Sequence, residues 1–593
     1  MGSIVGFTIY LELSPEESER TIARQSRALS PFAHLERITL PIGSSTLHVW
    51  GHSPLSERIH KMPDESTLAL IGSPHGEVTW HDVQENLLKI DHPEDFELPW
   101  DGRAILLHVS ADGNRWTIWN DWLGSIPTYY TDIRTGRIAS TLEPVTVAAA
   151  GCTPDDFFLP GLVSLLVNGH FISDWTLYKD VKTIPPDSVT QWDEKGFRAK
   201  QVWTLQPSQD RWAAGWDDLV DEMHALSHKA IADVLKTQST WILPLSSGLD
   251  SRLIAAVAAD VGVNAFTYAW GSSENTDVVY SRKIAKTLGF PWKHVTLPKD
   301  FLVRYTPQWS DWFGSAMHFQ GMYLMSFLDE LKTAPAAPVL SGYIGDVLAG
   351  DGLKNWILLH GVKSYQVNHE WYSDWGANQL RAVAKFPVDE ALKINTVNLK
   401  EQIESFPGAR FQQLLYLQLW NRQRSFTSYL SIVKDYWRGA ATPFINRSYA
   451  RFCTSLPRAT LENRRLLGDV FRRYYGRLAV IPGTYADSPF VLTGKYLVQR
   501  RVDKMLPSSL RRQLLKGFGK VDIGVDFEPI QTHGKDSLWP LFEVWDQLAE
   551  WFDVRQLEQD YQTIMASTKD PRPLRRLQAV QTFASQFLNR TKD

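Results

Sequence analysis

An apolar segment followed directly by small polar residues constrains the fold of this 593-residue chain more than any other feature. Residues 241–245 are apolar and predict a buried strand, and residues 253–259 predict a helix. A tight loop between a strand and a helix directs backbone N–H groups and the positive helix end toward an anion. Gly248 in this loop permits close approach of a phosphate. Asp250 would repel a bare phosphate, so its presence indicates a bridging Mg²⁺.

The same loop carries several hydroxyl donors and resembles a known phosphate-binding motif. It is similar to the pyrophosphate-binding loop, Ser-Gly-Gly-x-Asp-Ser, of ATP pyrophosphatases, which cleave ATP between the α and β phosphates. The closest branch in kind is the asparagine synthetase-like one, which includes β-lactam synthetase, carbapenam synthetase and the lasso-peptide cyclases. The resemblance implies that ATP is bound by Leu245, Ser246, Ser247, Gly248, Asp250 and Ser251. Ser247 stands where the family usually has its first Gly, and the lysine of a Walker A loop is absent, so kinase-type transfer is not indicated.

Bulk composition excludes several other classes of protein. The net charge of -4 disfavours a general nucleic-acid binder. The two cysteines, Cys152 and Cys453, provide neither a disulfide framework nor a zinc cluster, which fits a reducing cytoplasm. We find no signal peptide and no apolar stretch long enough to span a bilayer. We therefore expect a cytoplasmic protein that binds neither nucleic acid nor membranes.

The pattern along the chain predicts two domains. Short apolar or alternating runs at 3–11, 38–40, 47–50, 68–71, 104–109, 116–120, 128–131 and 137–140 predict a layered antiparallel β domain over residues 1–205. Strands at 241–245, 265–270, 294–297 and 339–340 alternate with helices at 212–235 and 277–288, which predicts a parallel α/β domain over residues 206–593. Helices are expected to dominate its later part, most clearly at 414–433, 449–456, 464–475 and 541–552. The fold class is thus mixed α/β and α+β.

The first residues resemble the start of class II glutamine amidotransferases, Met-Cys-x-Ile-x-Gly. That family attacks glutamine with the cysteine, but Gly2 stands at this position and has no thiol. Residues 120–130 resemble a second segment of the family, Arg-Asp-x-Leu-Gly-x-x-Pro-Leu-Tyr-Tyr. The resemblance implies an Ntn-type β sandwich without glutaminase chemistry, which acts as a structural support or as part of a substrate-binding wall. The nitrogen donor is then expected to be an amine carried by a substrate.

A second glycine-containing motif lies at residues 339–350 and resembles Ser-Gly-x-Gly-x-Asp of the synthetase family. Ser341 and Gly342 are then expected at the nucleotide, and Asp346 is expected to bind Mg²⁺ together with Asp250. Ile344 departs from the family, because it stands at the second Gly position. Tyr343 is the most discriminating residue, since asparagine synthetases have Glu there, whereas the β-lactam-forming members have a Tyr that pairs with a Glu to deprotonate an amine.

Further site residues follow from the resemblance, each with a structural alternative. Glu370 is a candidate partner of Tyr343, which would otherwise pack over adenine or substrate. Lys495 is the candidate for a catalytic lysine that stabilises negative charge, or is a solvated surface residue. Tyr268 and Trp270 are placed at the adenine, and the alternative for Trp270 is a position in the core. Asp277 is expected to complement the charge of a helix N-terminus rather than to act in catalysis.

Together these features predict a ligase that uses ATP and Mg²⁺. A substrate carboxylate attacks the α-phosphorus, pyrophosphate leaves, and an amine displaces AMP to form an amide. The substrate is expected to be a small molecule or peptide that carries both groups, closed to a lactam as in natural-product or lasso-peptide biosynthesis, where a precursor peptide and partner proteins occur. Two alternatives stay open: an asparagine synthetase that uses free ammonia, and a non-catalytic nucleotide-binding scaffold.

Overall fold

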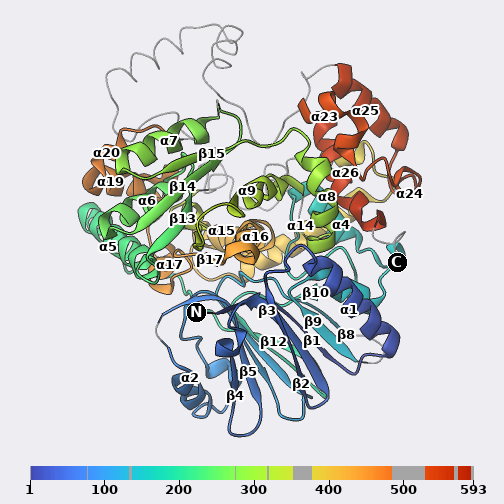
Figure 1. Cartoon of the computed structure of the whole chain (residues 1–593), viewed down its shortest axis with the longest axis horizontal. Coiled ribbons are helices and arrows are strands. Elements are labelled where there is room, and N and C mark those ends of the chain that lie inside the picture. Colours follow the sequence, from blue (N-terminus) through green and yellow to red (C-terminus); the bar gives the residue numbers. More distant parts are fainter. Residues whose placement is uncertain are drawn as a thin grey trace.

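The structure is a computed structural model of the chain (Figure 1). It describes residues 2–76, 78–132, 136–273, 275–316, 319–351, 377–483, 528–566 and 572–588. A large curled sheet lies at the bottom of Figure 1, and a smaller parallel sheet lies at the upper left. None of the helices in this described part combines the length and the apolarity needed to cross a bilayer.

The N-terminal part of the chain, residues 2–201 and called the N-terminal half below, is built on a 12-stranded sheet. Nine strands follow the path β10-β8-β9-β1-β5-β6-β7-β11-β12, and β2, β3 and β4 pair beside this path. Its strands are β1 (Ser3–Leu11), β2 (Glu36–Ile42), β3 (Ser45–His52), β4 (Ile59–Lys61), β5 (Thr67–His75), β6 (Asp101–Val109), β7 (Trp116–Asn120), β8 (Tyr129–Asp132), β9 (Arg137–Ser140), β10 (Lys182–Thr183), β11 (Ser188–Asp193) and β12 (Gly196–Gln201). Strand β1 pairs with β9 through residues 8–11 and with β5 only through Ile4 and Ile71. The sheet curls at this junction, so its two halves enclose an apolar core that includes Phe7, Leu107 and Trp116.

The second sheet has five parallel strands in the order β15-β14-β13-β16-β17. They are β13 (Thr240–Pro244), β14 (Asn264–Trp270), β15 (Trp292–Val295), β16 (Val339–Leu340) and β17 (Ala440–Ala441). Helices α5 (Trp216–Leu235), α6 (Leu249–Val261) and α7 (Thr276–Leu288) accompany it. Helix α7 ends at Gly289 with φ of 77°, as a left-handed C-cap requires. The predicted mixed α/β fold class is confirmed, and the predicted boundary at residues 205 and 206 lies between β12 and α5.

Helices form most of the rest of the described chain. They include α14 (Val388–Ser405), α15 (Arg410–Gln418), α16 (Ser428–Arg438), α17 (Arg447–Thr454), α19 (Arg465–Tyr474), α20 (Gly476–Ala479) and, at the C-terminal end, α23 (Glu528–His533), α24 (Trp545–Leu548), α25 (Val554–Ala566) and α26 (Arg572–Leu588). The expected helix at 414–433 is helical throughout, but its centre is the π-helix η6 (Leu419–Thr427) between α15 and α16. Another helix prediction is wrong. Within the expected helix at 541–552 only α24 is helical, because turns flank it on both sides.

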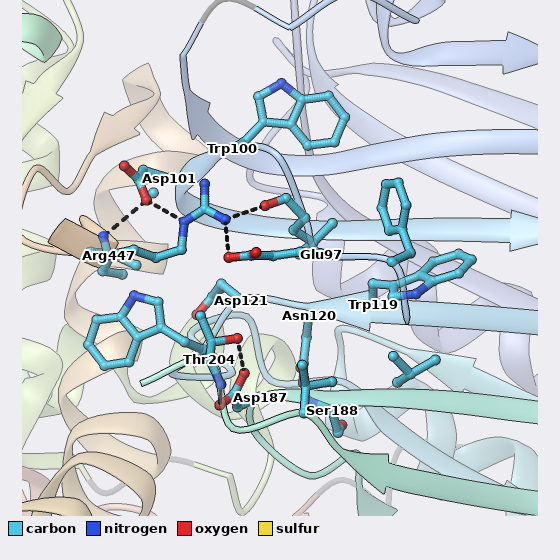
Figure 2. A pocket seen from close by; sticks show the side chains of 17 residues that line it. Glu97, Trp100, Asp101, Trp119, Asn120, Asp121, Asp187, Ser188, Thr204 and Arg447 are labelled. Carbon is cyan, nitrogen blue, oxygen red and sulfur yellow. Dashed lines mark hydrogen bonds and ion pairs between the residues drawn. The ribbon is translucent and has the colours of Figure 1, made fainter. Parts of the chain in front are cut away.

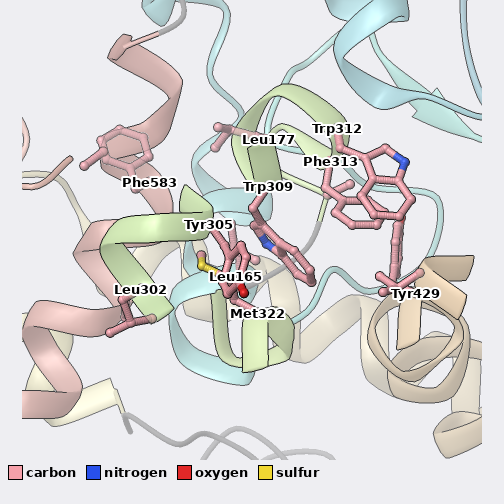
Figure 3. Packing of buried hydrophobic residues seen from close by; sticks show 14 of the residues in the cluster. Leu165, Leu177, Leu302, Tyr305, Trp309, Trp312, Phe313, Met322, Tyr429 and Phe583 are labelled. Carbon is pink, nitrogen blue, oxygen red and sulfur yellow. The ribbon is translucent and has the colours of Figure 1, made fainter. Parts of the chain in front are cut away.

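Helix α16 lies between the two sheets and contacts both halves of the protein (Figure 1). Asp435 of this helix pairs with Arg103 of β6 at 3.5 Å, and both side chains are buried. Aromatic packing continues the contact, because Trp312 of α8 (Phe301–Phe313) packs against Tyr436. Phe313 packs against both Trp312 and Tyr429 (Figure 3). The two halves therefore share one continuous core.

A buried carboxyl group joins α3 (Glu143–Ala150) to the end of α8. The Glu143 carboxylate accepts hydrogen bonds from the hydroxyl and the backbone N–H of Ser315. Gly314 has φ of 56°, and a Cβ there would lie 2.1 Å from Glu143 Oε2, so only glycine fits. Burial raises the pKa of Glu143 from 4.5 to about 7.

This pKa predicts a pH-dependent stability. The folded protein holds the Glu143 proton between about pH 4.5 and 7, whereas the unfolded chain releases it, so the free energy of unfolding decreases as pH rises through this window. Glu143→Gln mimics the protonated acid and should raise stability at pH 7.5 by about 1–3 kcal/mol. We expect the difference in melting temperature between variant and wild type to shrink toward pH 4.5. A difference that is independent of pH would contradict the assignment.

Candidate functional site

A cavity of about 680 Å³ lies at the carboxyl ends of strands β13 and β16. The loop after β13, the segment after β16, the π-helix η6 and helix α16 line it, together with Asn168 and Gly169 from the N-terminal half. The predicted site residues on its wall are Leu245, Ser246, Gly248, Asp250, Ser251, Trp270, Ser341, Gly342, Tyr343 and Asp346. Ser247 and Tyr268 are absent from this wall, and Glu370 and Lys495 lie outside the described residues. The structure thus brings together most of the predicted set.

The loop between β13 and α6 is closed by its own hydroxyl groups. Ser251 Oγ accepts from the backbone N–H of Ser246 at 3.1 Å and lies 2.9 Å from Ser246 Oγ. Ser246 Oγ in turn accepts from the N–H of Gly248 at 3.1 Å. Gly248 is the N-cap of α6, and no side chain caps this end of the helix. The first N–H groups of α6 therefore face the cavity without a capping side chain, as in helix termini that bind phosphate.

The serine that departs from the family pattern has a structural partner. Ser247 donates to Asp277 Oδ1 from its backbone N–H at 2.9 Å and from its hydroxyl at 2.5 Å. Asp277 is in the first turn of α7, so this pair ties the loop to the next helix. The Ser247 hydroxyl, expected as a phosphate donor, is directed to Asp277 instead.

Arg252 is a loop-holding residue that the sequence did not indicate. It is fully buried in α6 and donates to four carbonyl oxygens, those of Ser247, Leu478, Ile481 and Pro482, at 2.8–3.0 Å. Burial, followed by the charge of Arg464, lowers the pKa of Arg252 to about 10. From the sequence, an arginine in an apolar helix is expected to lie at the surface. The structure shows instead that Arg252 joins the loop after β13 to residues 478–482.

Asp250 and Asp346 lie side by side at the cavity. Burial raises the pKa of Asp250 well above its ordinary value, and the negative charge of Asp346 is the next largest cause. Burial also raises the pKa of Asp346, with Asp351 as the next cause. Two glycines make room for this pair, since a Cβ at Gly345 would lie 3.1 Å from Asp250 Cγ and one at Gly342 would lie 3.2 Å from Asp250 Cβ.

This donor set fits Mg²⁺ bound together with a nucleotide. Mg²⁺ in proteins is usually held by one or two carboxylates, with phosphate oxygens and water as the other ligands. Among the described residues no group of three or more His, Cys, Asp or Glu side chains is arranged to hold a metal ion by itself. A divalent ion between Asp250 and Asp346 would relieve their repulsion and needs phosphate or water to complete its shell.

Ile344 shows how the second motif tolerates its departure. It stands where the family has glycine, and its φ is 62°, in the left-handed region that glycine adopts readily. A β-branched side chain in this region costs about 1–3 kcal/mol. The backbone keeps the shape that a glycine would give, so Asp346 still reaches the cavity two residues later.

Tyr343 is buried at the cavity wall. Its hydroxyl donates to the backbone carbonyl of Gln423 in η6 at 2.5 Å. Burial raises the pKa of Tyr343 well above 10. These contacts favour a neutral phenol that positions η6. The role as a base and the alternative of packing over adenine or substrate both stay predictions.

Of the two aromatic residues at the end of β14, one lines the cavity and the other lies in the core. Trp270 lines the cavity and lies 5.1 Å from Phe327 and 6.0 Å from Tyr323, between ring centroids. Tyr268 is buried beside Phe327. Trp270 therefore remains the candidate for stacking on a base, whereas Tyr268 supports the sheet.

The place of the missing glutaminase nucleophile is closed. A Cβ added at Gly2 would lie 1.8 Å from the backbone oxygen of Pro54. The second amidotransferase-like segment is structural here, because buried Asp121 accepts from the N–H of Leu123 at 3.0 Å and from Ser125 Oγ at 2.6 Å. Asp121 borders a cavity of only about 30 Å³, together with Asp187 and Arg447 (Figure 2).

Known proteins provide one family match for this site. Residues 224–466 match the family model of asparagine synthase. This segment covers less than half of the chain and contains the loop, both aspartates and Tyr343. The match identifies it as a domain of the asparagine synthase type, which implies the use of ATP. No curated protein matches the chain.

Two solved structures resemble the chain weakly. Glutamine phosphoribosylpyrophosphate amidotransferase from B. subtilis, complexed with ADP and GMP, is 9% identical with a TM-score of 0.23, over 49% of this chain and 65% of that one. A structure of the allosteric regulatory enzyme of purine biosynthesis is 8% identical with a TM-score of 0.23, over 49% of this chain and 64% of that one. The matched region therefore spans less than two thirds of either relative.

The acidic pair predicts opposite effects on stability and on binding. Asp250→Asn removes one of two repelling charges, so Tm should stay equal or rise, whereas affinity for Mg²⁺ with α,β-methylene-ATP should fall at least 100-fold. Calorimetric titration and thermal melting measure the two quantities. Asp260→Asn, at the far end of α6, is the matched control and should bind as wild type does, because Asp260 lies outside the cavity wall. Undiminished binding by Asp250→Asn would contradict the metal site.

The closed N-terminal site predicts that a cysteine does not restore glutaminase activity. Gly2→Cys would force a Cβ into the Pro54 backbone, so Tm should fall and glutamine should not be hydrolysed. Glutamate release from glutamine, measured with and without ATP, tests this. Appearance of glutaminase activity would show that the pocket opens.

Proposed function

We propose that the protein is an ATP-dependent carbon–nitrogen ligase that adenylates a substrate carboxylate and then forms an amide, releasing AMP and pyrophosphate. The observation that carries the proposal is the shared cavity, whose wall contains an uncapped helix N-terminus and two adjacent aspartates, Asp250 in the first turn of that helix and Asp346 after β16. The asparagine synthase match over the same residues supports it.

Different groups of the cavity wall bind the phosphates and the metal ion. The N–H groups at the start of α6 bind phosphate oxygens, and Asp250 and Asp346 would hold Mg²⁺. Bound Mg²⁺ would neutralise charge on the phosphates and favour departure of pyrophosphate. The cavity walls hold the carboxylate and the amine near the α-phosphorus, where proximity accelerates both steps.

We further propose that the amine belongs to the substrate itself, so that closure yields a lactam in a small molecule or a peptide of the lasso type. The crowded Gly2 supports this, because the N-terminal half has no space for a cysteine nucleophile that would supply ammonia. Free ammonia as the nucleophile, as in an ammonia-dependent asparagine synthetase, is the competing case.

The products test the proposal. Incubation with α-labelled ATP, Mg²⁺ and a panel of amino-carboxylate compounds should give AMP and pyrophosphate in equal amounts. One substrate should lose the mass of one water, which intact mass spectrometry detects. Release of ADP and phosphate would contradict adenylation, and amide formation only with aspartate and ammonia would favour an asparagine synthetase. Binding of ATP without any turnover across the panel would favour a scaffold.

A further inference from the structure

A buried lysine lines the same cavity and was not predicted from the sequence. Lys434 of α16 is 8% exposed, and its Nζ lies 3.4 Å from Ser341 Oγ. Within the described part of the chain no carboxylate lies within 4.0 Å of this Nζ, and burial alone accounts for the lowering of its pKa to about 8. A buried cation without a counter-charge is costly, so this position calls for an anion in the cavity.

The lysine lies close to the predicted phosphate site. Ser341, its hydrogen-bond partner, follows β16, and a Cβ on the next residue, Gly342, would lie 3.5 Å from the backbone nitrogen of Ser251. Lys434, Ser341 and the first turn of α6 thus form one contiguous patch of the wall. The positive N-terminal end of α6 and the Lys434 ammonium group therefore lie next to each other.

The N-terminal half fixes the direction of this side chain. Asp435, the next residue, pairs with Arg103, and its carbonyl oxygen accepts from His52 Nε2 at 2.7 Å. Tyr436 accepts from Trp50 Nε1 at 2.9 Å. Because both following residues of α16 are held by the N-terminal half, the helix cannot rotate, and Lys434 is kept toward the cavity.

We propose that Lys434 binds an anionic phosphate oxygen of the nucleotide in this cavity. This inference rests on the proposed function and deepens it. The other charged groups that line the cavity are Asp250, Asp277, Asp346, Asp351 and Arg422. A phosphate beside Lys434 favours its ammonium form, so nucleotide binding near pH 8 should draw a proton onto this residue.

Calorimetric titration with Mg²⁺ and α,β-methylene-ATP tests the proposal at pH 8 in buffers of different ionisation enthalpy. Lys434→Met should raise Kd about 10- to 100-fold, the effect of one charge-assisted hydrogen bond. The proton uptake should fall by roughly half a proton relative to wild type, because a group of pKa near 8 is half protonated there. Lys434→Arg should retain more affinity than Lys434→Met and show the same loss of proton uptake, since arginine stays charged.

Lys332→Met is the matched control. Lys332 Nζ lies 5.1 Å from the Trp437 ring beside the same helix, but it is exposed and outside the cavity wall, so this variant should bind as wild type does. Equal Kd and equal proton uptake in folded Lys434→Met and wild type would overturn the proposal. If Lys434→Met does not fold, the wild-type Kd decides, because it should rise between pH 7 and 9 and a constant Kd overturns the proposal. Failure of wild type to bind the probe at all would instead overturn the proposed function.

Discussion

The parallel pairing of β13 with β16 sets the chemistry of this protein. Carboxyl ends of neighbouring parallel strands meet at one edge of the sheet, so the segments that follow them must share the same space. Asp250 and Asp346 come from these two segments, and their charges repel across a buried wall. The fold holds this unfavourable pair with glycines at 342 and 345 and with the four-carbonyl clamp of Arg252. Such an arrangement gains most when a divalent ion enters.

The N-terminal half holds one wall of the cavity in place. A Cβ at Gly2 would clash with the Pro54 backbone, and this half packs against the rest of the protein through a shared core. Arg424 of η6 donates to the carbonyl oxygen of Ser173 and to Thr183 Oγ1, each at 3.0 Å, while Arg103 holds Asp435 of α16. These contacts fix the two helical segments that form one wall of the cavity. The N-terminal half thus acts as a rigid support for the cavity.

Much of the architecture could be predicted because it depends on local patterns. Strands β1, β7, β9 and β16 begin and end where the sequence predicted, and the loop at 246–251 lies at the cavity. The misses depend on tertiary contacts. The π-helix at 419–427 has no sequence signature, since its register is set by tertiary contacts such as those of Gln423 with Tyr343 and of Arg424 with Thr183. In the sequence, Lys434 looks like a solvent-exposed polar residue of an amphipathic helix. Only the structure shows that α16 is buried on both sides and that Lys434 is buried with it.

The most direct measurement is a crystal structure of the protein with Mg²⁺ and α,β-methylene-ATP. We expect a metal ion bound by one carboxylate oxygen from each of Asp250 and Asp346, with phosphate oxygens at the N-terminus of α6. A triphosphate bound elsewhere, or a metal ion that contacts neither aspartate, would contradict the central claim that this acidic pair activates a nucleotide.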